Sequence, residues 1–275
     1  MKIRKRLKNF VALIAIIFLI HIVHALTLDR IIQYVEIPFY SSRVSEDLDG
    51  YRIAFVADTH DISAERLERV VARLNETDID MLLVGGDIRS DITDSRWYAI
   101  EILSRTETTD GIFASPGNHD LPRSRYFSEL RTHGVTDIFN NGIHIHENFY
   151  IVGVTAPWHI ADAVSAAHPD DFVLLAVHIP DVTMETSTNG IDLILSGHTH
   201  GGQVNFFGLW APYFYFTDGI TMHGQRFREG WAKSADGVPV YVTNGIGTYF
   251  PRVFARPQVV IITLRRDVQR GISNP

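Results

Sequence analysis

Hydrophobic residues form one long run at the start of the chain and only short runs after it. From Phe10 to Ile20 no polar residue occurs, and the apolar segment continues to Leu26 with His21 and His24 as its only polar residues. Residues 10–26, at a rise of about 1.5 Å each, reach the short end of a bilayer span. We therefore assign residues 1–30 to a membrane segment.

Basic residues before this segment predict its orientation. Five of them lie in the first eight positions, and no acidic residue precedes Asp29. Positive charge favours a cytoplasmic N-terminus and an exported C-terminal body. Ala25 is a small residue that suits signal-peptidase cleavage, so a secreted protein cut near Ala25 is an alternative. We favour a single-pass signal anchor in the cell membrane, because the two histidines are untypical of a cleavage region.

After residue 30 the pattern alternates between strand and helix signals. Residues 31–50 are largely polar apart from a short extended piece at 34–39, and we expect a tether there. Apolar residues at helical spacing predict helices at 64–75, 97–103 and 126–131. Short apolar runs between turn residues predict strands at 51–57, 80–84, 111–114, 143–145, 150–154, 172–177, 191–195, 238–243 and 258–264. With no repeat and no interior linker, residues 51–275 are expected to form one α/β domain with a β-rich second half.

The amino-acid composition excludes several classes of protein. Hydrophobic residues make up 45% of the 275 positions, which excludes a disordered chain. The absence of cysteine excludes disulfide scaffolds, thiolate metal sites and cysteine nucleophiles. Outside the basic N-terminus, 20 basic residues stand against 32 acidic ones. A body this acidic is not expected to bind nucleic acid and is suited to divalent cations.

Side chains of the types that bind metals follow directly after five of the predicted strands. They are Asp58 and His60, Asp87, Asn118 with His119 and Asp120, His178, and His198 with His200. Functional groups of α/β proteins gather at the carboxyl ends of strands, so we expect these side chains at one edge. Neutral imidazoles with carboxylate and amide oxygens suit zinc, manganese or iron. Without His119 and Asp120, seven of these residues are potential ligands, which is too many for one tetrahedral ion and fits two ions that share a bridging carboxylate.

Each of these short motifs is weak by itself. An Asp-x-His pair is usually a solvated loop, Gly-Asp after a strand is often a turn, and a lone histidine is commonly a core residue. The joint pattern, at successive strand ends and with glycines beside the ligands, is what favours metal binding. The remaining histidines of the body lack such a context and are interpreted as surface or structural residues: His133, His144, His146, His159, His168 and His223.

The ordered blocks resemble the calcineurin-like metallophosphoesterase superfamily. They are Asp58-x-His60, Gly86-Asp87, Gly117-Asn118-His119-Asp120, His178 and Gly197-His198-Thr199-His200. The extension to Gln203 and the segment Thr243-Asn-Gly-Ile-Gly247 resemble a bacterial membrane-associated branch. Two departures from the pattern are Asp91, one position later than the usual second acid, and Asp61, where a glycine is common.

The resemblance implies a four-layer sandwich of two mixed β-sheets flanked by helices, and a particular set of roles. One divalent ion would be held by Asp58, His60, Asp87 and His200, and the other by Asp87, Asn118, His178 and His198. Asp87 would bridge, while a hydroxide between the ions would attack phosphorus. His119 would face the phosphate, stabilise its charge or protonate the leaving oxygen, and Asp120 would orient His119.

The expected function is the metal-dependent hydrolysis of phosphomonoesters or phosphodiesters at the membrane. The alternative is a catalytically silent scaffold of the same fold, which is disfavoured because such scaffolds lose ligands and all seven are present. The apolar segment 206–216 favours either contact with a lipid or cell-envelope substrate or ordinary packing. Arg123 and Arg125 are surface charges or the grip for a second phosphate. The sequence leaves the substrate, the native metal and the oligomeric state open.

Overall fold

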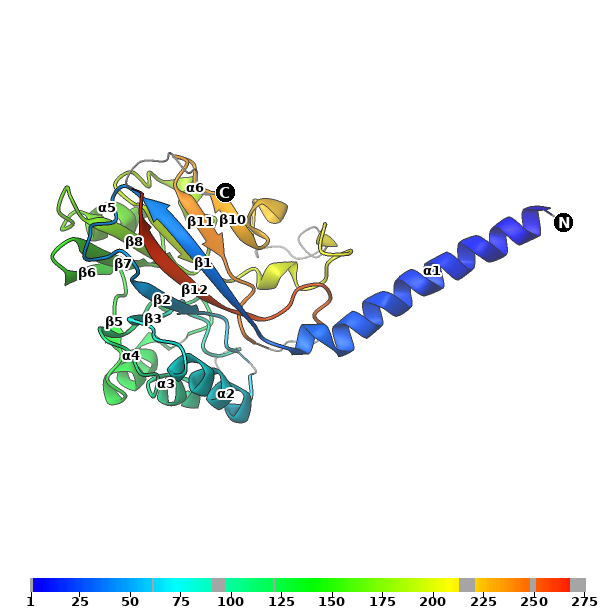
Figure 1. Ribbon diagram of the computed structural model, residues 1–275, viewed down its shortest axis with the longest axis horizontal. Helices are drawn as coiled ribbons and strands as arrows, with labels where there is room; N and C mark the ends of the chain where they lie inside the picture. Colours follow the sequence, from blue (N-terminus) through cyan, green and yellow to red (C-terminus); the bar gives the residue numbers. More distant parts are fainter. Residues whose placement is uncertain are drawn as a thin grey trace.

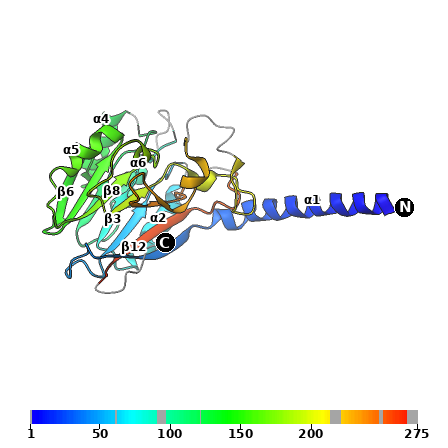
Figure 2. The same ribbon diagram turned by 90° about the horizontal axis from the view of Figure 1, so that it is seen from above.

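The computed structural model describes residues 2–60, 62–90, 97–120, 122–212, 221–247 and 251–267. The first helix, α1 (Lys2–Leu26), extends away from the rest of the molecule (Figures 1 and 2). It is long and apolar enough to cross a membrane, a property that signal sequences share. A short 3-10 helix, η1 (Leu28–Arg30), joins it to the body.

Two six-stranded mixed sheets form the body. In the order in which they pair, the strands of the first sheet are β1 (Gln33–Ser41), β12 (Gln258–Arg266), β2 (Arg52–Val56), β3 (Met81–Val84), β4 (Gly111–Ala114) and β5 (Thr136–Asp137). Only the β12–β2 pair of this sheet is antiparallel. The carboxyl ends of β2, β3 and β4 therefore lie at the same edge.

The second sheet has parallel strands at its centre and antiparallel strands at both edges. In pairing order its strands are β10 (Gly230–Lys233), β11 (Pro239–Val242), β9 (Leu193–Ser196), β8 (Phe172–Val177), β7 (Phe149–Val154) and β6 (Asn141–His146). Strands β7, β8 and β9 are buried along their whole length. Continuous apolar sequence is what a parallel strand covered on both faces requires.

The two sheets pack face to face and helices cover their outer faces (Figure 1). The core between the sheets is rich in phenylalanine, with Phe55 and Phe113 from one sheet and Phe149 and Phe172 from the other. Helices α2 (Ala64–Asn75), α3 (Tyr98–Leu103) and α4 (Arg123–Thr132) contribute to a second core with the first sheet. The short helices α5 (Ile160–Val164), α6 (Val182–Glu185) and η5 (Gly224–Phe227) pack on the second sheet, and η2 (Pro157–His159) contacts α5 and α6. The expected four-layer sandwich is confirmed.

Helix α2 shows how sequence determines one of these layers. Ser63 caps its first turn by accepting a hydrogen bond from the Arg66 amide. The predicted apolar stripe is buried against the first sheet at Leu67, Val70, Val71 and Leu74. The charged residues of the helix remain on the opposite face.

The structure differs from the sequence interpretation between residues 31 and 50. Strand β1 occupies Gln33–Ser41 and pairs in parallel with β12 along its full nine residues. This part of the expected tether is therefore an edge strand of the sheet. An edge strand is covered less completely than a central one, so the sequence of β1 contains fewer apolar residues. The strand was therefore harder to predict. The four-residue β10 and the two-residue β5 also lacked a sufficiently long apolar run.

Candidate metal centre

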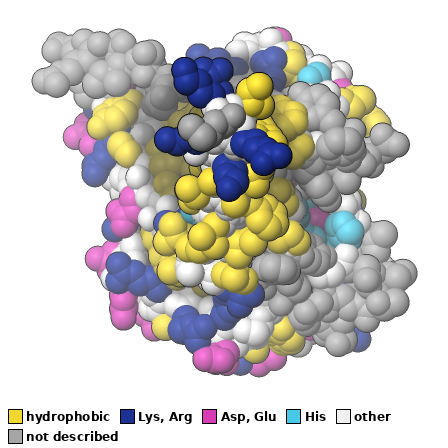
Figure 3. All heavy atoms as spheres, turned by 90° about the vertical axis from the view of Figure 1, so that its right-hand side faces the viewer, with side chains coloured by type: hydrophobic (Ala, Val, Ile, Leu, Met, Phe, Trp, Pro, Cys, Tyr) yellow, Lys and Arg dark blue, Asp and Glu magenta, His cyan; other side chains and the backbone are white. Residues whose placement is uncertain are grey.

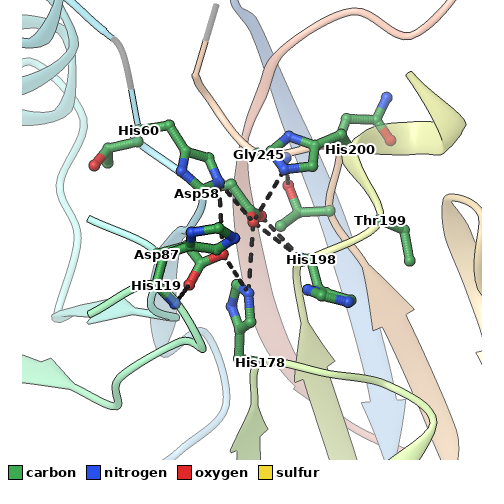
Figure 4. A network of polar contacts seen from close by, with 12 residues as sticks. Asp58, His60, Asp87, His119, His178, His198, Thr199, His200 and Gly245 are labelled. Atoms are coloured by element: carbon green, nitrogen blue, oxygen red, sulfur yellow. Dashed lines mark hydrogen bonds and ion pairs between the residues drawn. The ribbon is translucent and has the colours of Figure 1, made fainter. Parts of the chain in front are cut away.

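The carboxyl ends of strands from both sheets meet at one place (Figure 4). Asp58 and His60 follow β2, and Asp87 follows β3. From the second sheet, His178 follows β8, while His198 and His200 follow β9 and reach the 3-10 turn η3 (His200–Gly202). The sheets thus converge on the predicted constellation from opposite layers.

The ligand atoms of these six residues fall into two groups, each within 4.8 Å. One group is Asp58, His60 and His200, and the other is Asp87, His178 and His198. The resemblance assigned Asp58, His60 and His200 to one ion and His178 and His198 to the other, with Asp87 shared by both. Five of the six side chains are buried, and His200 is half-buried.

Two carboxylate oxygens lie between the imidazoles. Oδ2 of Asp87 is 3.1 Å from Nε2 of His178 and 3.5 Å from Nε2 of His60, so it touches both groups. Oδ1 of Asp58 lies 3.7 Å from Nε2 of His178 and 3.8 Å from Nε2 of both His60 and His200. Separations of this size leave room for a cation between a carboxylate oxygen and an imidazole nitrogen.

The carboxylates and imidazoles alter one another's proton affinity. Burial, with the nearby Asp87 charge, raises the pKa of Asp58 to about 7. Burial opposes ionisation of Asp87 too, but the charge and hydrogen bond of His178 outweigh it and lower the pKa of Asp87. For His178, burial is outweighed by Asp87 and the pKa rises to about 10. Burial lowers the pKa of His60 to about 4, which keeps that ring neutral. The site is built for positive charge that compensates its two carboxylates.

Hydrogen bonds from the far side of two rings fix which nitrogen faces the centre. Nδ1 of His60 lies 2.9 Å from the Arg89 carbonyl oxygen, and Nδ1 of His178 lies 2.8 Å from that of Gly85. A carbonyl can only accept, so Nδ1 carries the proton and Nε2 presents a lone pair in the neutral ring. This is the usual arrangement of metal-binding histidines, and the donor set therefore fits divalent ions.

His200 is held differently. Nη2 of Arg252 lies 3.2 Å from its Nδ1, and a guanidinium can only donate. The proton of a neutral His200 ring then lies on Nε2, so coordination through Nε2 would displace that proton. Burial, with His60 and Arg252 beside it, lowers the pKa of His200 and keeps the ring uncharged.

The backbone of the centre is unusual. Asp58, His60, Asp87, His198 and His200 all have positive φ, between 38° and 72°. This left-handed conformation costs roughly 1–2 kcal/mol for a residue with a Cβ. Gly86, also at positive φ, has no room for a side chain, because a Cβ there would be 2.2 Å from the Gly117 nitrogen. The turns between strand and ligand are therefore tight enough to aim consecutive side chains into one space.

His119 and Asp120 were predicted as a catalytic pair in which Asp120 orients His119, but they are arranged differently. The His119 ring meets the His60 ring edge-on with centroids 5.4 Å apart, at the margin of the centre. Asp120 is fully buried, and its carboxylate accepts hydrogen bonds from the amides of Asp87, Ile88 and Gly117, each at 2.8 Å. Its carboxylate thus braces the backbone of two ligand loops. The Asp87 carboxylate is the group that bonds His119, through the His119 amide at 2.8 Å.

The other predicted site residues lie in the loop before His119 or in helix α4. Asn118 is exposed in the loop before His119. Arg123 donates to the Asp120 carbonyl and Arg125 pairs with Glu129, so both guanidinium groups have partners on their own segment. Asp61, Asp91 and residues 213–216 of the apolar segment lie outside the described residues.

Sequence reasoning missed two contributors to the centre. Arg252 is buried and contacts His200, although it follows a proline in an apolar segment that carried no ligand signal. Gly245 lies against Asp58, where a Cβ would be 2.4 Å from the Asp58 Cβ. The motif around Gly245 was recognised only as a family resemblance, because its contact with Asp58 spans most of the domain.

Comparison with known proteins identifies the family. The profile described as calcineurin-like phosphoesterase matches residues 51–202, which is more than half of the chain. The chain belongs to the calcineurin-like phosphoesterase family. It is accordingly a hydrolase of phosphoester bonds from a metal-dependent family, and it carries matching groups of potential metal ligands.

Relatives share much of its length. The uncharacterized metallophosphoesterase YkuE of Bacillus subtilis is 27% identical over 261 residues, covering 86% of each chain. Phosphodiesterase YaeI of Escherichia coli is 27% identical over 78% of this chain and 82% of its own length. A Danio rerio transmembrane protein with a metallophosphoesterase domain is 25% identical over 84% of this chain and 56% of its own length. Among solved structures, TT1561 of Thermus thermophilus covers 71% of this chain and 90% of its own, at 13% identity and a TM-score of 0.48.

Proposed function

We propose that this protein hydrolyses phosphoesters with two divalent ions, on a body anchored outside the cytoplasm by α1. The position of Asp87 carries the proposal. One oxygen of its carboxylate lies within 3.5 Å of an imidazole from each group, as a bridging ligand must. Asp58, His60 and His200 would complete one ion site, and Asn118, His178 and His198 the other.

Bound divalent ions would acidify a water molecule and neutralise the charge of the phosphoryl oxygens. The chain's own residues supply positioning. Asp120 holds the Asp87 and Gly117 loops by their amides, so both ligand loops keep one geometry. His119 is partly exposed beside His60, where it can donate a proton to the leaving oxygen or stabilise phosphoryl charge.

We further propose that the substrate is an amphiphilic phosphoester presented at the membrane surface. A groove of about 550 Å³ lies between α1 and the body, lined by Ile17, Phe18 and His21 and by Val204 and Val253. Its two body loops are the ones that carry His200 and Arg252. Figure 3 shows hydrophobic side chains gathered on the face from which α1 emerges. Acyl or prenyl groups would suit this surface, whereas a water-soluble metabolite would gain nothing from it.

Contacts at the base of α1 favour a retained anchor. Ala25 is 6% exposed, so the residue before the alternative cleavage point is packed within the folded protein. Asp29 accepts hydrogen bonds at 3.0 Å from the amides of Phe254 and Ala255, and its Oδ2 is 2.6 Å from His24 Nδ1. The junction between helix and body is therefore specifically built, as an anchored protein requires.

The decisive assay is hydrolysis by full-length protein in detergent micelles after loading with manganese, zinc or iron. Nitrophenyl phosphate and bis-nitrophenyl phosphate would report monoesterase and diesterase activity. A lipid phosphoester should be cleaved faster in mixed micelles than its short-chain counterpart. Two ions per chain at the metal centre, with metal-dependent turnover, are expected. A folded protein that binds metal without cleaving any ester would instead support the silent scaffold.

Orientation has a separate test. Protease added to intact spheroplasts of a bacterial host should digest the body and leave residues 1–26 in the membrane. Soluble exported protein starting near Leu26 would establish cleavage. A body protected from protease would place the site in the cytoplasm and contradict the proposed orientation.

A further inference from the structure

A second cluster of histidine and aspartate lies at the opposite end of the second sheet. Asp171 immediately precedes β8, whereas His178 of the metal centre immediately follows it. Six strand residues at about 3.3 Å each separate the two positions by roughly 20 Å. The cluster also contains His144 from edge strand β6 and His168 from the turn before β8. It is therefore distinct from the centre described above.

The three side chains converge on one point. Their ligand atoms lie within 4.8 Å of one another. Nε2 of His144 is 2.9 Å from Oδ2 of Asp171, and Nδ1 of His168 is 3.8 Å from Oδ1. Donors bound at about 2.1 Å around a tetrahedral zinc ion lie about 3.4 Å apart, which falls between these two distances.

One oxygen of the cluster has no hydrogen bond. The Asp171 side chain is 0% exposed, and its Oδ1 is buried without a hydrogen-bond partner among the described residues. Leaving a buried carboxylate oxygen unsatisfied costs free energy, and native structures rarely do so without a ligand or water. Oδ1 belongs to the same carboxylate that bonds His144, so a cation placed there would meet both imidazoles.

Neighbouring groups hold the cluster in place. Arg43 donates to the carbonyl oxygens of Pro169 at 2.6 Å and Asp171 at 2.5 Å, which fixes the turn. The His168 amide donates to Oδ2 of Asp171 at 2.6 Å. The His144 ring lies between those of Tyr150 and His168, with centroids 4.6 and 4.5 Å away. A site arranged in advance loses little entropy when an ion binds.

We propose that His144, His168 and Asp171 form a third metal site, for a zinc-class divalent ion with water as its remaining ligand. Two imidazoles and one carboxylate with an open position are a donor set that zinc accepts. The ion would tie the edge strand β6 to the turn that begins β8. This site would stabilise the fold and take no part in hydrolysis.

The test is the zinc content of full-length protein in detergent micelles after dialysis against about 1 µM free Zn²⁺. His168→Asn and His144→Asn should each hold one ion per chain fewer than the unaltered protein. The matched control is His146→Asn, which lies on the same strand but bonds Asp110 at 2.7 Å. This control should keep the full zinc content. His168 is 67% exposed, so its replacement leaves the core untouched.

Two further measurements keep the third site separate from the metal centre. Asp87→Asn should retain the ion that His168→Asn loses, and hydrolysis by His168→Asn should match that of the unaltered protein. Equal zinc content in all variants would overturn the proposal. Loss of the same ion in His146→Asn would overturn it as well, because that residue is outside the cluster.

Discussion

Imidazoles and carboxylates gather at both ends of β8, but the backbone that carries them differs. At the carboxyl end, five of the six residues in the two ligand groups have positive φ. At the amino end, none of His144, His168 and Asp171 does. The first set is almost entirely buried, whereas both histidines of the second set are exposed.

The difference shows where the fold accepts conformational cost. Left-handed residues with a Cβ persist only when surrounding structure fixes them, and they concentrate at functional sites. Burial of two aspartates side by side at the carboxyl end adds an electrostatic cost that bound cations would remove. The cluster at the amino end of β8 has no left-handed residues and no pair of adjacent buried aspartates. Its ligands can therefore be replaced without loss of the fold.

The largest difference in hydrolytic activity is expected between Asp87→Asn and Asp171→Asn. An amide at position 87 cannot neutralise two cations, so activity should fall to background. Asp171→Asn should leave turnover unchanged while removing the ion at the amino end. Steady-state hydrolysis and metal content of both variants check this. Comparable activity in the two would show that Asp87 does not bridge.

His119→Ala should lower turnover of an alkyl ester by roughly 10²–10⁴-fold, because a proton donor to the leaving oxygen is lost. The effect should be smaller for a nitrophenyl ester, whose leaving group needs little protonation. Metal content should not change. His133→Ala, a histidine outside both clusters, is the control. Equal losses for both esters would assign His119 a purely electrostatic role.

Gly86→Ala should destabilise the protein by about 2–4 kcal/mol, because the added Cβ collides with backbone of the neighbouring ligand loop. Gly134→Ala is the control, since Gly134 also has positive φ but no atom lies within 4 Å of its Cβ position. That substitution should cost only about 1–2 kcal/mol. Urea unfolding measures both. Equal costs would mean that the tight turn is not what position 86 requires.

The smallest effect is expected for Asp29→Asn, which weakens the link between α1 and the loop that carries Arg252. One hydrogen bond contributes about 1 kcal/mol, so loosening this loop should lower kcat by at most about five-fold, with unchanged metal content. Asp49→Asn removes a similar carboxylate that accepts from the Arg266 amide at 3.0 Å. This control should retain full kcat. A lowered kcat in both variants would indicate a general effect of destabilisation.

How much could be predicted from sequence depended on the range of the interactions involved. Apolar runs in the sequence predict the buried central strands, and the polar residue that follows each run can be read from the local sequence. For this reason the six aspartates and histidines of the centre could be grouped before the fold was known. The pairing of β1 with β12 could not, because its partner lies over two hundred residues away.

Residues that act through others were the hardest to assign. Asp120 was expected beside the His119 ring, yet its carboxylate bonds the amides of two loops. Backbone donors leave no mark in a sequence, so nothing pointed to this role. His144, His168 and Asp171 were likewise passed over, since the fold brings together strand β6 and the turn before β8, and neither segment carries a recognised motif.

The parallel pairing of β1 with β12 also determines when the protein can finish folding during its synthesis. Residues 33–41 leave the ribosome more than two hundred residues before their partners, residues 258–266. The second neighbour of β12 is β2, so the edge of β2 that faces it also waits for residues 258–266. Such distant pairing slows folding and leaves strand edges open in the meantime. A chain cut short before residue 258 would therefore lack β12, and both β1 and β2 would lose a pairing partner.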